Sequence, residues 1–125
     1  MTSVRSIAAI ASDLRSNAVK GGTVSVLSDD LTPSTGYVVG QHGISGPSET
    51  LDFEGWVRSV LPEVAFQPAH YVGVWEEDGV TYLDVVRIHQ DRRAALDDAL
   101  ARGEIAIYDL TESECIHLAD TFTRA

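Results

Sequence analysis

Five side chains could bind a transition metal through nitrogen or sulfur: His42, His70, His89, Cys115 and His117. Structural zinc sites usually contain close ligand pairs, in which two cysteines or two histidines are separated by a few residues. Cys115 and His117 form the one close pair in the sequence, and residues at this spacing share a face of a strand. Because the other histidines are scattered, the spacing favours a buried cysteine and an exposed histidine. We therefore expect no metal and no other cofactor.

A glycine-rich segment, Gly40–Gly46, has the spacing Gly-x-x-Gly-x-x-Gly. A glycine-rich loop before a helix can hold a phosphate, but this spacing matches neither the dinucleotide nor the P-loop pattern. The start of the next helix is crowded by carboxylates that would repel an anion, namely Glu49, Asp52 and Glu54. We interpret the segment as a flexible connection. The alternative function is a small enzyme or ligand-binding domain that uses this loop with His42 or His70.

The remaining reactive groups do not form a recognisable catalytic centre. A nucleophilic thiolate needs a base or positive surroundings, whereas Cys115 has Glu112, Glu114 and Asp120 as neighbours. Adjacent carboxylates occur at three places in the sequence. Neighbouring helix residues point about 100° apart, and a hairpin turn is exposed, so neither gives the fixed, partly buried pair of acid–base catalysis. We therefore expect that the protein is not an enzyme.

The second half of the chain contains the pattern most typical of a binding surface. An Asp-Gly pair between two apolar runs, 71–75 and 80–86, predicts a β-hairpin. Its aromatic residues can cluster across the strands, and an uncovered aromatic face with an acidic rim is typical of a protein-binding surface. The helix that follows adds further carboxylates. The predicted partner-binding residues are Tyr71, Trp75, Glu76, Glu77, Asp78, Tyr82, Asp91, Asp97 and Asp98.

The charge of the chain restricts the class of partner. Nine basic and nineteen acidic residues give a net charge of −10, and residues 63–125 alone carry five basic and thirteen acidic side chains. This charge opposes direct binding to nucleic acid and to anionic membranes, because both depend on Lys and Arg. It favours a basic protein partner. Two alternatives are that the acidic half mimics a nucleic-acid backbone or that it only keeps the protein soluble.

Hydrophobic periodicity predicts the elements that position these residues. Thr2 or Ser3 is expected to cap the first helix, Ser48 or Thr50 the second and Asp91 the third, while Pro62 and Gly103 mark helix ends. The third helix is expected to turn Ala95, Leu96, Ala99 and Leu100 inward and Arg92, Asp98 and Arg102 toward water. The predicted helices are 4–18, 50–62 and 91–102, and the predicted strands are 23–27, 37–39, 71–75, 80–86, 105–108 and 115–118.

These elements predict one α+β domain over residues 1–125: a small mixed sheet with an N-terminal helix, a β-hairpin and a C-terminal ββαβ unit. The strand at 37–39 is expected to pair antiparallel with the first strand, and the ββαβ order implies that the strand after the third helix is parallel to the strand before it. A homodimer through an edge strand is left open. A single cysteine allows no intrachain disulfide, and the sequence shows neither a secretory pattern nor a membrane span, so we expect a cytoplasmic protein.

Several segments together resemble a known group. These are Thr32–Val39, with its Thr-Pro-x-x-Gly-Tyr pattern, and the C-terminal runs Tyr71–Trp75, Tyr82–Val85, Asp91–Ala95 and Ala106–Leu110. The pattern resembles small uncharacterised proteins of actinobacterial phages and mobile elements, a group that implies a setting but no established activity. The functional hypothesis is a non-enzymatic acidic interaction module of this type. It would bind a host or phage protein through its C-terminal hairpin and acidic helix.

Overall fold

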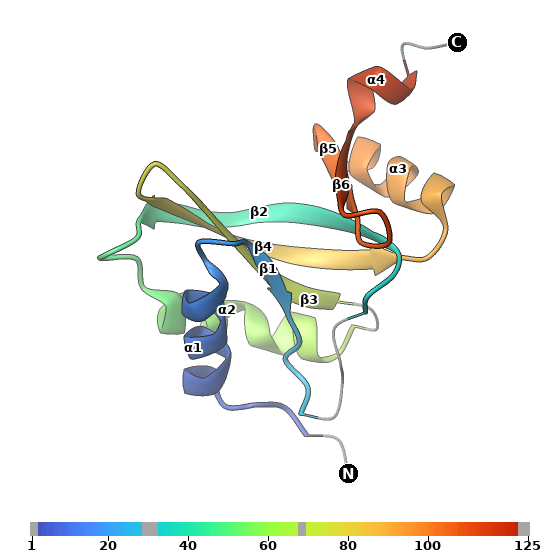
Figure 1. The fold of residues 1–125 in the computed structure, drawn as a ribbon. Coiled ribbons are helices and arrows are strands. Elements are labelled where there is room, and N and C mark those ends of the chain that lie inside the picture. Colours follow the sequence, from blue (N-terminus) through green and yellow to red (C-terminus); the bar gives the residue numbers. More distant parts are fainter. Residues whose placement is uncertain (1–2, 29–32, 68–69, 123–125) are drawn as a thin grey trace. The chain divides into compact units, whose positions relative to one another are not determined.

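The computed structural model describes residues 3–28, 33–67 and 70–122, and its fold is α+β, as the sequence predicts. Within these residues hydrogen bonding joins six strands in the order β1-β3-β4-β2-β5-β6 (Figure 1). The helices are α1 (Ile7–Asn17), α2 (Phe53–Ala65), α3 (Arg92–Ala101) and α4 (Leu118–Phe122). The strands are β1 (Gly22–Val24), β2 (Tyr37–Pro47), β3 (His70–Glu77), β4 (Val80–His89), β5 (Ala106–Asp109) and β6 (Glu114–His117).

The chain divides into two compact units. Unit 1 consists of Met1–Thr32 and His42–Val85, and unit 2 consists of Pro33–Gln41 and Val86–Ala125. Strands β2 and β4 each contribute residues to both units. The expectation of a single domain over 1–125 stays a prediction, and each unit is described by itself. None of the helices in the described residues is long and apolar enough to cross a membrane.

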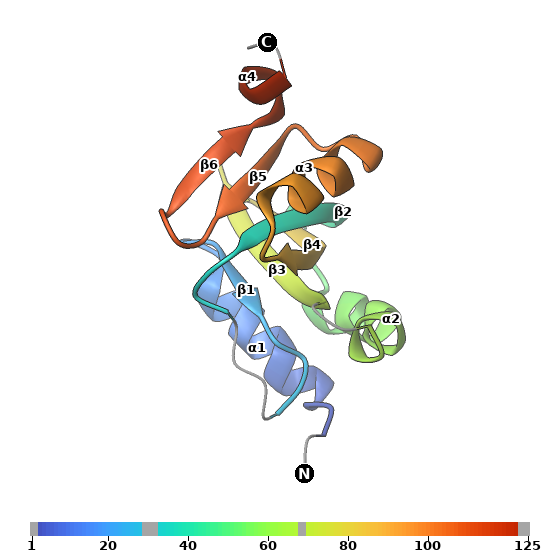
Figure 2. The same ribbon diagram turned by 90° about the vertical axis from the view of Figure 1, so that its right-hand side faces the viewer.

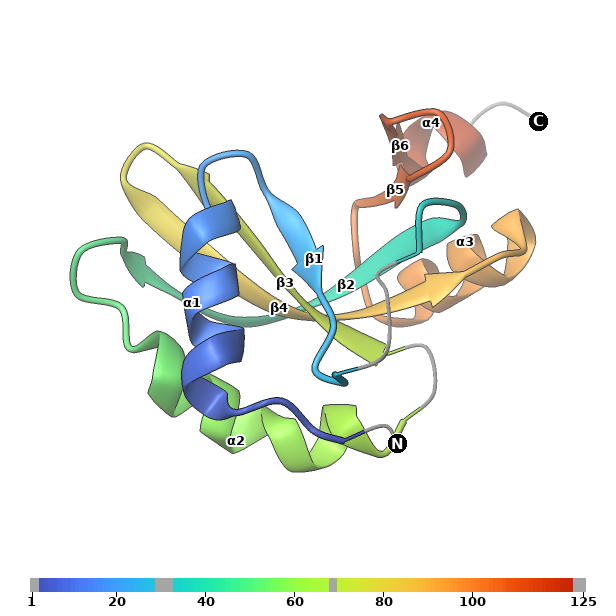
Figure 3. The same ribbon diagram turned by 60° about the horizontal axis from the view of Figure 1, so that its bottom comes forward.

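In unit 1, α1 and α2 pack on one face of the strands (Figure 3). The core is formed by apolar residues of both helices and of β1, β3 and β4, among them Leu14, Phe53, Val72 and Leu83. Helix α1 begins later than predicted, because residues 4 and 5 pair with the backbone that follows β1. Ser6 is its N-cap and accepts a hydrogen bond from the Ala9 amide. Of the two expected caps, Ser3 bonds to Ser28 instead, and Thr2 lies outside the described residues.

Helix α2 is also shifted relative to its prediction. Asp52 is the N-cap, with its carboxylate accepting from the Gly55 amide, so the expected caps Ser48 and Thr50 are wrong. The helix continues past Pro62 to Ala65. A proline inside a helix loses one backbone hydrogen bond. The burial of Val64 in the core, to 1% exposure, accounts for the extra turn.

The glycine-rich segment is not a loop. Residues 40–46 belong to the eleven-residue strand β2, which pairs antiparallel with β5 at Tyr37 and Val38. At Gly43 an added Cβ would lie 2.6 Å from the Leu83 carbonyl oxygen and 2.7 Å from Nε1 of Trp56. Glycine is therefore required here for a close approach of the neighbouring elements. The expected pairing of this strand with the first strand is wrong as well, because β1 pairs with β3.

The predicted hairpin is confirmed. Its two-residue turn has positive φ at both positions, 53° at Asp78 and 79° at Gly79, which is the signature of a type I′ turn. Strands β3 and β4 extend beyond the predicted runs to His70 and His89.

In unit 2, α3 packs beside β2 and β5 (Figure 2). Asp91 is its N-cap and Gly103, at φ +72°, follows its end, as predicted. Ala95, Leu96 and Ala99 are buried with Val39 and Ile107, whereas Leu100 is 60% exposed and was wrongly expected inside. Strand β5 lies between β2 and β6 and is antiparallel to both.

Candidate functional site

Two aromatic residues of the hairpin stack on each other. Counting outward from the two-residue turn, Trp75 of β3 stands directly opposite Tyr82 of β4. Their ring centroids are 4.0 Å apart and the rings are inclined by only 8°. Trp75 remains 41% exposed, which is high for a large aromatic side chain in a strand. The cross-strand aromatic cluster expected from the sequence is therefore present as this pair.

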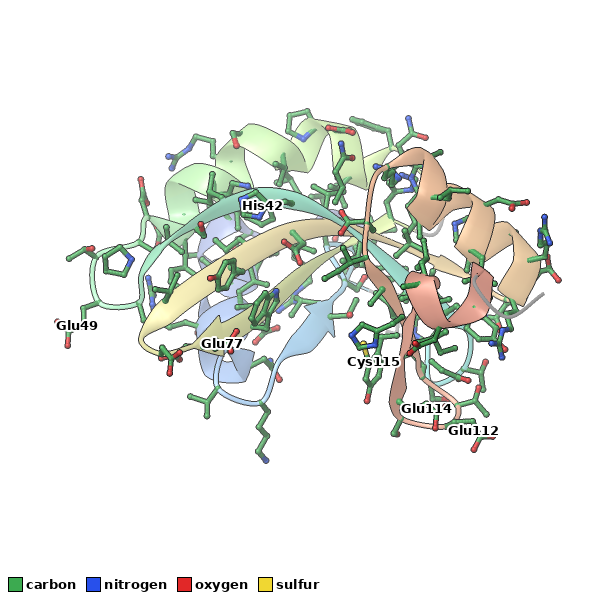
Figure 4. All side chains as sticks on the ribbon, turned by 90° about the horizontal axis from the view of Figure 1, so that it is seen from above. His42, Glu49, Glu77, Glu112, Glu114 and Cys115 are labelled. Carbon is green, nitrogen blue, oxygen red and sulfur yellow. The ribbon has the colours of Figure 1, made fainter. Side chains whose placement is uncertain are left out.

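The pair lies on the face of the strands opposite α1 and α2. Side chains alternate along a strand, and Val72 and Val74 of β3 and Leu83 of β4 belong to the core under the two helices. Trp75 and Tyr82 are one residue out of phase with them and point to the other face. Figure 4 shows this face, with His42 on β2 and Glu77 at the end of β3.

His42 extends the aromatic pair onto a third strand. Its ring meets Tyr82 edge-to-face, with centroids 6.4 Å apart and planes inclined by 60°. Its Nδ1 lies 3.9 Å from Oδ1 of Asp84, whose side chain is 20% exposed. The imidazole that was a candidate acid–base group in a loop is thus fixed on a strand beside an aromatic pair. His70, the other histidine of that alternative, is the half-buried first residue of β3.

Tyr71 does not belong to the exposed surface. It was predicted as a partner-binding residue on the same face as Trp75, but it is buried, with 6% of its surface accessible. The alternation along β3 was interpreted correctly, yet alternation alone does not show which part of a face is covered.

The acidic residues of the turn form the rim of the aromatic pair. Glu77 and Asp78 are exposed, and Glu76 is half-buried. Among the described residues neither Glu77 nor Asp78 has an ion-pair partner. We call the set Trp75, Tyr82, Glu77 and Asp78 the hairpin surface.

The turn is anchored by Ser48, which follows β2. The Ser48 amide donates to the Gly79 carbonyl at 2.9 Å, and its hydroxyl lies 3.0 Å from the same oxygen. The Ser48 hydroxyl is also 2.7 Å from that of Thr81, which is fully buried. The hairpin surface is therefore presented by a turn that is fixed from outside the hairpin.

The carboxylates predicted on α3 have a different role. Asp98 is only 12% exposed and accepts hydrogen bonds from Arg87, 3.2 Å away, and from Arg102, 2.8 Å away, while its other oxygen lies 2.8 Å from Nε2 of His89. The expectation that Asp98 and Arg102 face water is wrong. The four side chains join β4 to α3 within unit 2.

Three other acidic residues of unit 2 bind groups of the same unit. Asp91 caps α3, and Asp97 forms an exposed pair with Arg93 one turn away. Asp109, one of the carboxylates that nucleic-acid mimicry would need on the surface, is 7% exposed and accepts from the amides of Thr111 and Glu112. The spacing of Asp98 and Arg102 could have indicated their pairing, but nothing in the sequence identifies Asp109 as a buried turn residue.

Cys115 and His117 lie on strand β6, where an open groove of about 420 Å³ is lined by residues that include Arg92, Asp120 and both of them. Cys115 is exposed, so the expectation of a buried cysteine is wrong, and His117 is exposed as expected. Over the described ranges, no three His, Cys, Asp or Glu side chains are grouped closely enough to hold a metal ion.

Comparisons of the chain with protein-family models, with curated proteins and with solved structures gave no significant match.

Proposed function

We propose that this chain is a non-enzymatic interaction module that binds a basic segment of another protein through the hairpin surface. The observation that carries the proposal is the exposed Trp75, stacked on the half-buried Tyr82, on the strand face opposite α1 and α2. Trp and Tyr are enriched among the residues that contribute most to binding energy in protein interfaces. Neither residue belongs to the core of unit 1, so the open part of the indole is available to a partner.

The charge of unit 1 supports a basic partner. Its sequence contains four basic and eleven acidic residues, a net charge of −7, whereas unit 2 contains five and eight, a net charge of −3. Complementary charge steers a partner toward the surface and raises the association rate. Near the aromatic pair the acidic residues of unit 1 are Glu77, Asp78 and Asp84, whereas four others belong to α1 and α2 or cap α2 on the opposite face.

The proposal leaves out two parts of the initial hypothesis. Asp98 and Asp109 are held inside unit 2, so they do not offer a regular row of carboxylates for nucleic-acid mimicry. Helix α3 contributes at most Asp91 and Asp97 to a surface. The phage setting rests on the sequence resemblance alone, and it implies a phage or host protein in the bacterial cytoplasm as the partner.

The experiment is a capture assay from an actinobacterial lysate with three forms of the chain: wild type, Trp75→Ala and Phe66→Ala. Phe66 is the matched control, because it is an aromatic residue of unit 1 that is 81% exposed but lies at the end of α2. We expect one protein to be retained by wild type and Phe66→Ala and lost with Trp75→Ala. Its purified form should bind Trp75→Ala about 30-fold more weakly than wild type. Equal retention by all three forms would contradict the proposal.

A further inference from the structure

The indole of Trp75 has one occupied face and one open side. Tyr82 stacks on the β4 side, 4.0 Å away. On the β1 side the pairing of Gly22 with Val74 places Gly21 opposite Trp75. An added Cβ at Gly21 would be 3.7 Å from the Cβ of Trp75 and would have no indole ring atom within 4 Å, so Gly21 adjoins the base of the Trp75 side chain without covering its ring. Because glycine has no side chain, it leaves a shelf beside the open face of the ring.

The Tyr82 ring, which lies behind the indole, has ring contacts on two sides. Tyr82 is held between Trp75 on one side and the edge contact with His42 on the other, and His42 lies beside Asp84. A rigid aromatic platform loses little conformational entropy when a ligand stacks on it. The shelf is therefore suited to a planar, rigid group of a ligand.

The charges around the shelf are predominantly negative. Glu77 is two residues from Trp75 on the same strand, so its carboxylate is on the same face, and it is exposed. Asp78 follows in the turn. Lys20, which directly precedes Gly21, is the neighbouring positive charge and is exposed. Two exposed carboxylates, Glu77 and Asp78, against one exposed ammonium group, Lys20, favour a cationic ligand at this position.

We infer that the shelf beside Trp75 receives an arginine side chain of the partner protein, with the guanidinium stacked on the indole and paired with the Glu77 carboxylate. This inference rests on the proposed function and names the group that is recognised. Arginine fits better than lysine because its guanidinium is planar, weakly hydrated and able to stack on an aromatic face while donating to a carboxylate. Lysine offers a compact, strongly hydrated charge without a plane to stack.

The test compares two nine-residue peptides of glycine and serine that differ in two central residues, which are arginine in one and lysine in the other. Their net charges are equal, so a purely electrostatic surface would bind them equally. We expect the arginine peptide to bind the full chain at least about fivefold more tightly in an NMR titration. The indole signal of Trp75 should shift, and that of Trp56, which is 6% exposed, should not.

Four variants make the test specific. Trp75→Ala should abolish the preference for arginine. Gly21→Asn should also remove it, since asparagine tolerates the positive φ of 77° at this position and its side chain would cover the shelf. Glu77→Gln should weaken binding about threefold and Lys20→Ala should strengthen it about twofold, as expected for loss of an attractive and a repulsive charge. Phe66→Ala is the control, and a wild-type pattern of amide signals establishes that each variant is folded.

Each other outcome overturns the inference. Equal affinity for both peptides, or the absence of a Trp75 shift with either, would exclude arginine as the recognised group. A Trp75 shift with a neutral disaccharide, unaffected by Glu77→Gln, would assign the shelf to sugars. The proposed function is judged separately by the capture assay. If a protein is captured only when Trp75 is present, but binds equally well after its arginines are replaced by lysine, the inference about arginine is contradicted and the proposed function is not. If capture does not depend on Trp75, the inference and the proposed function are both contradicted.

Discussion

Unit 2 holds Asp98 among Arg87, His89 and Arg102 and uses Asp109 to cap a turn, whereas unit 1 exposes Glu77 and Asp78 at a hairpin turn beside an open aromatic pair. Both units are acidic by composition. The difference is that Asp98 and Asp109 accept hydrogen bonds from groups of unit 2, whereas Glu77 and Asp78 have no ion-pair partner among the described residues. Net charge along a sequence therefore does not locate a binding surface, because it does not distinguish carboxylates with internal partners from free ones.

The largest expected effect of a single change on stability is in unit 2. Asp98→Ala leaves two arginines and a histidine around a vacated, mostly buried position, and should lower the free energy of unfolding by about 3 kcal/mol. The matched control is Asp97→Ala, whose ion pair is exposed on both sides and should contribute about 0.5 kcal/mol or less. Urea denaturation measures both. Similar losses for the two variants would contradict the internal role assigned to Asp98.

The scaffold of the hairpin surface gives the next largest effect. Gly43→Ala places a Cβ 2.6 Å from the Leu83 carbonyl oxygen and 2.7 Å from the Trp56 indole, and should cost about 2 kcal/mol through overpacking. Gly46→Ala is the control on the same strand, because its Cβ meets only the flexible end of Leu51 at 3.1 Å. We expect it to cost well under half as much in the same denaturation experiment. Equal costs would mean that the close approach at Gly43 is not what requires glycine.

Gly79 and Gly103 allow the two units to be compared at positions where no carboxylate is changed. Gly79 in unit 1 and Gly103 in unit 2 have φ of 79° and 72°, and an added Cβ at either position meets nothing within 4 Å. Replacement by alanine should therefore cost about 1 kcal/mol at each site, from backbone strain alone. Thermal unfolding of the two variants should show nearly equal shifts. A much larger loss at Gly79 would contradict the assignment of the cost to backbone strain alone.

The smallest effect on stability is expected at the hairpin surface itself. Glu77→Gln removes an exposed charge with no ion-pair partner among the described residues, so the free energy of unfolding should change by no more than about 0.5 kcal/mol. The same variant should bind the captured partner more weakly. Denaturation and a binding titration on one preparation measure the effects on stability and on binding separately. A stability loss comparable to that of Asp98→Ala would place Glu77 among the internal carboxylates and end the contrast between the units.

Much of the fold could be predicted because local signals and tertiary structure agree. The Asp78-Gly79 turn and the glycine after α3 have a positive φ, which few residues adopt. Asp91 caps α3 through its side chain, which accepts a hydrogen bond from the Ala94 amide. The glycine-rich part of β2 could not be predicted, because glycine is typical of loops and its use here comes from the approach of Leu83 and Trp56, which are distant in sequence. Secondary-structure propensity reflects only neighbouring residues in the sequence, whereas close packing depends on residues that are distant in sequence.

The candidate site was predicted only in part for a similar reason. Trp75 and Tyr82 stand opposite each other because the two-residue turn fixes the register of the hairpin. This turn can be recognised in the sequence. The burial of Tyr71 and of Asp98, and the position of His42 beside Tyr82, depend on which elements cover which strand face. No spacing rule within one element contains that information.

The most direct test of the account is hydroxyl-radical footprinting of the chain, alone and saturated with its captured partner, read by mass spectrometry. In the free chain Trp75, Phe66 and Tyr108 are exposed enough to be oxidised, with exposed fractions of 41%, 81% and 42%. We predict that the partner protects Trp75 and leaves Phe66 and Tyr108 reactive. Undiminished oxidation of Trp75 in the complex, with protection at Tyr108 of unit 2 instead, would contradict the assignment of binding to the hairpin surface.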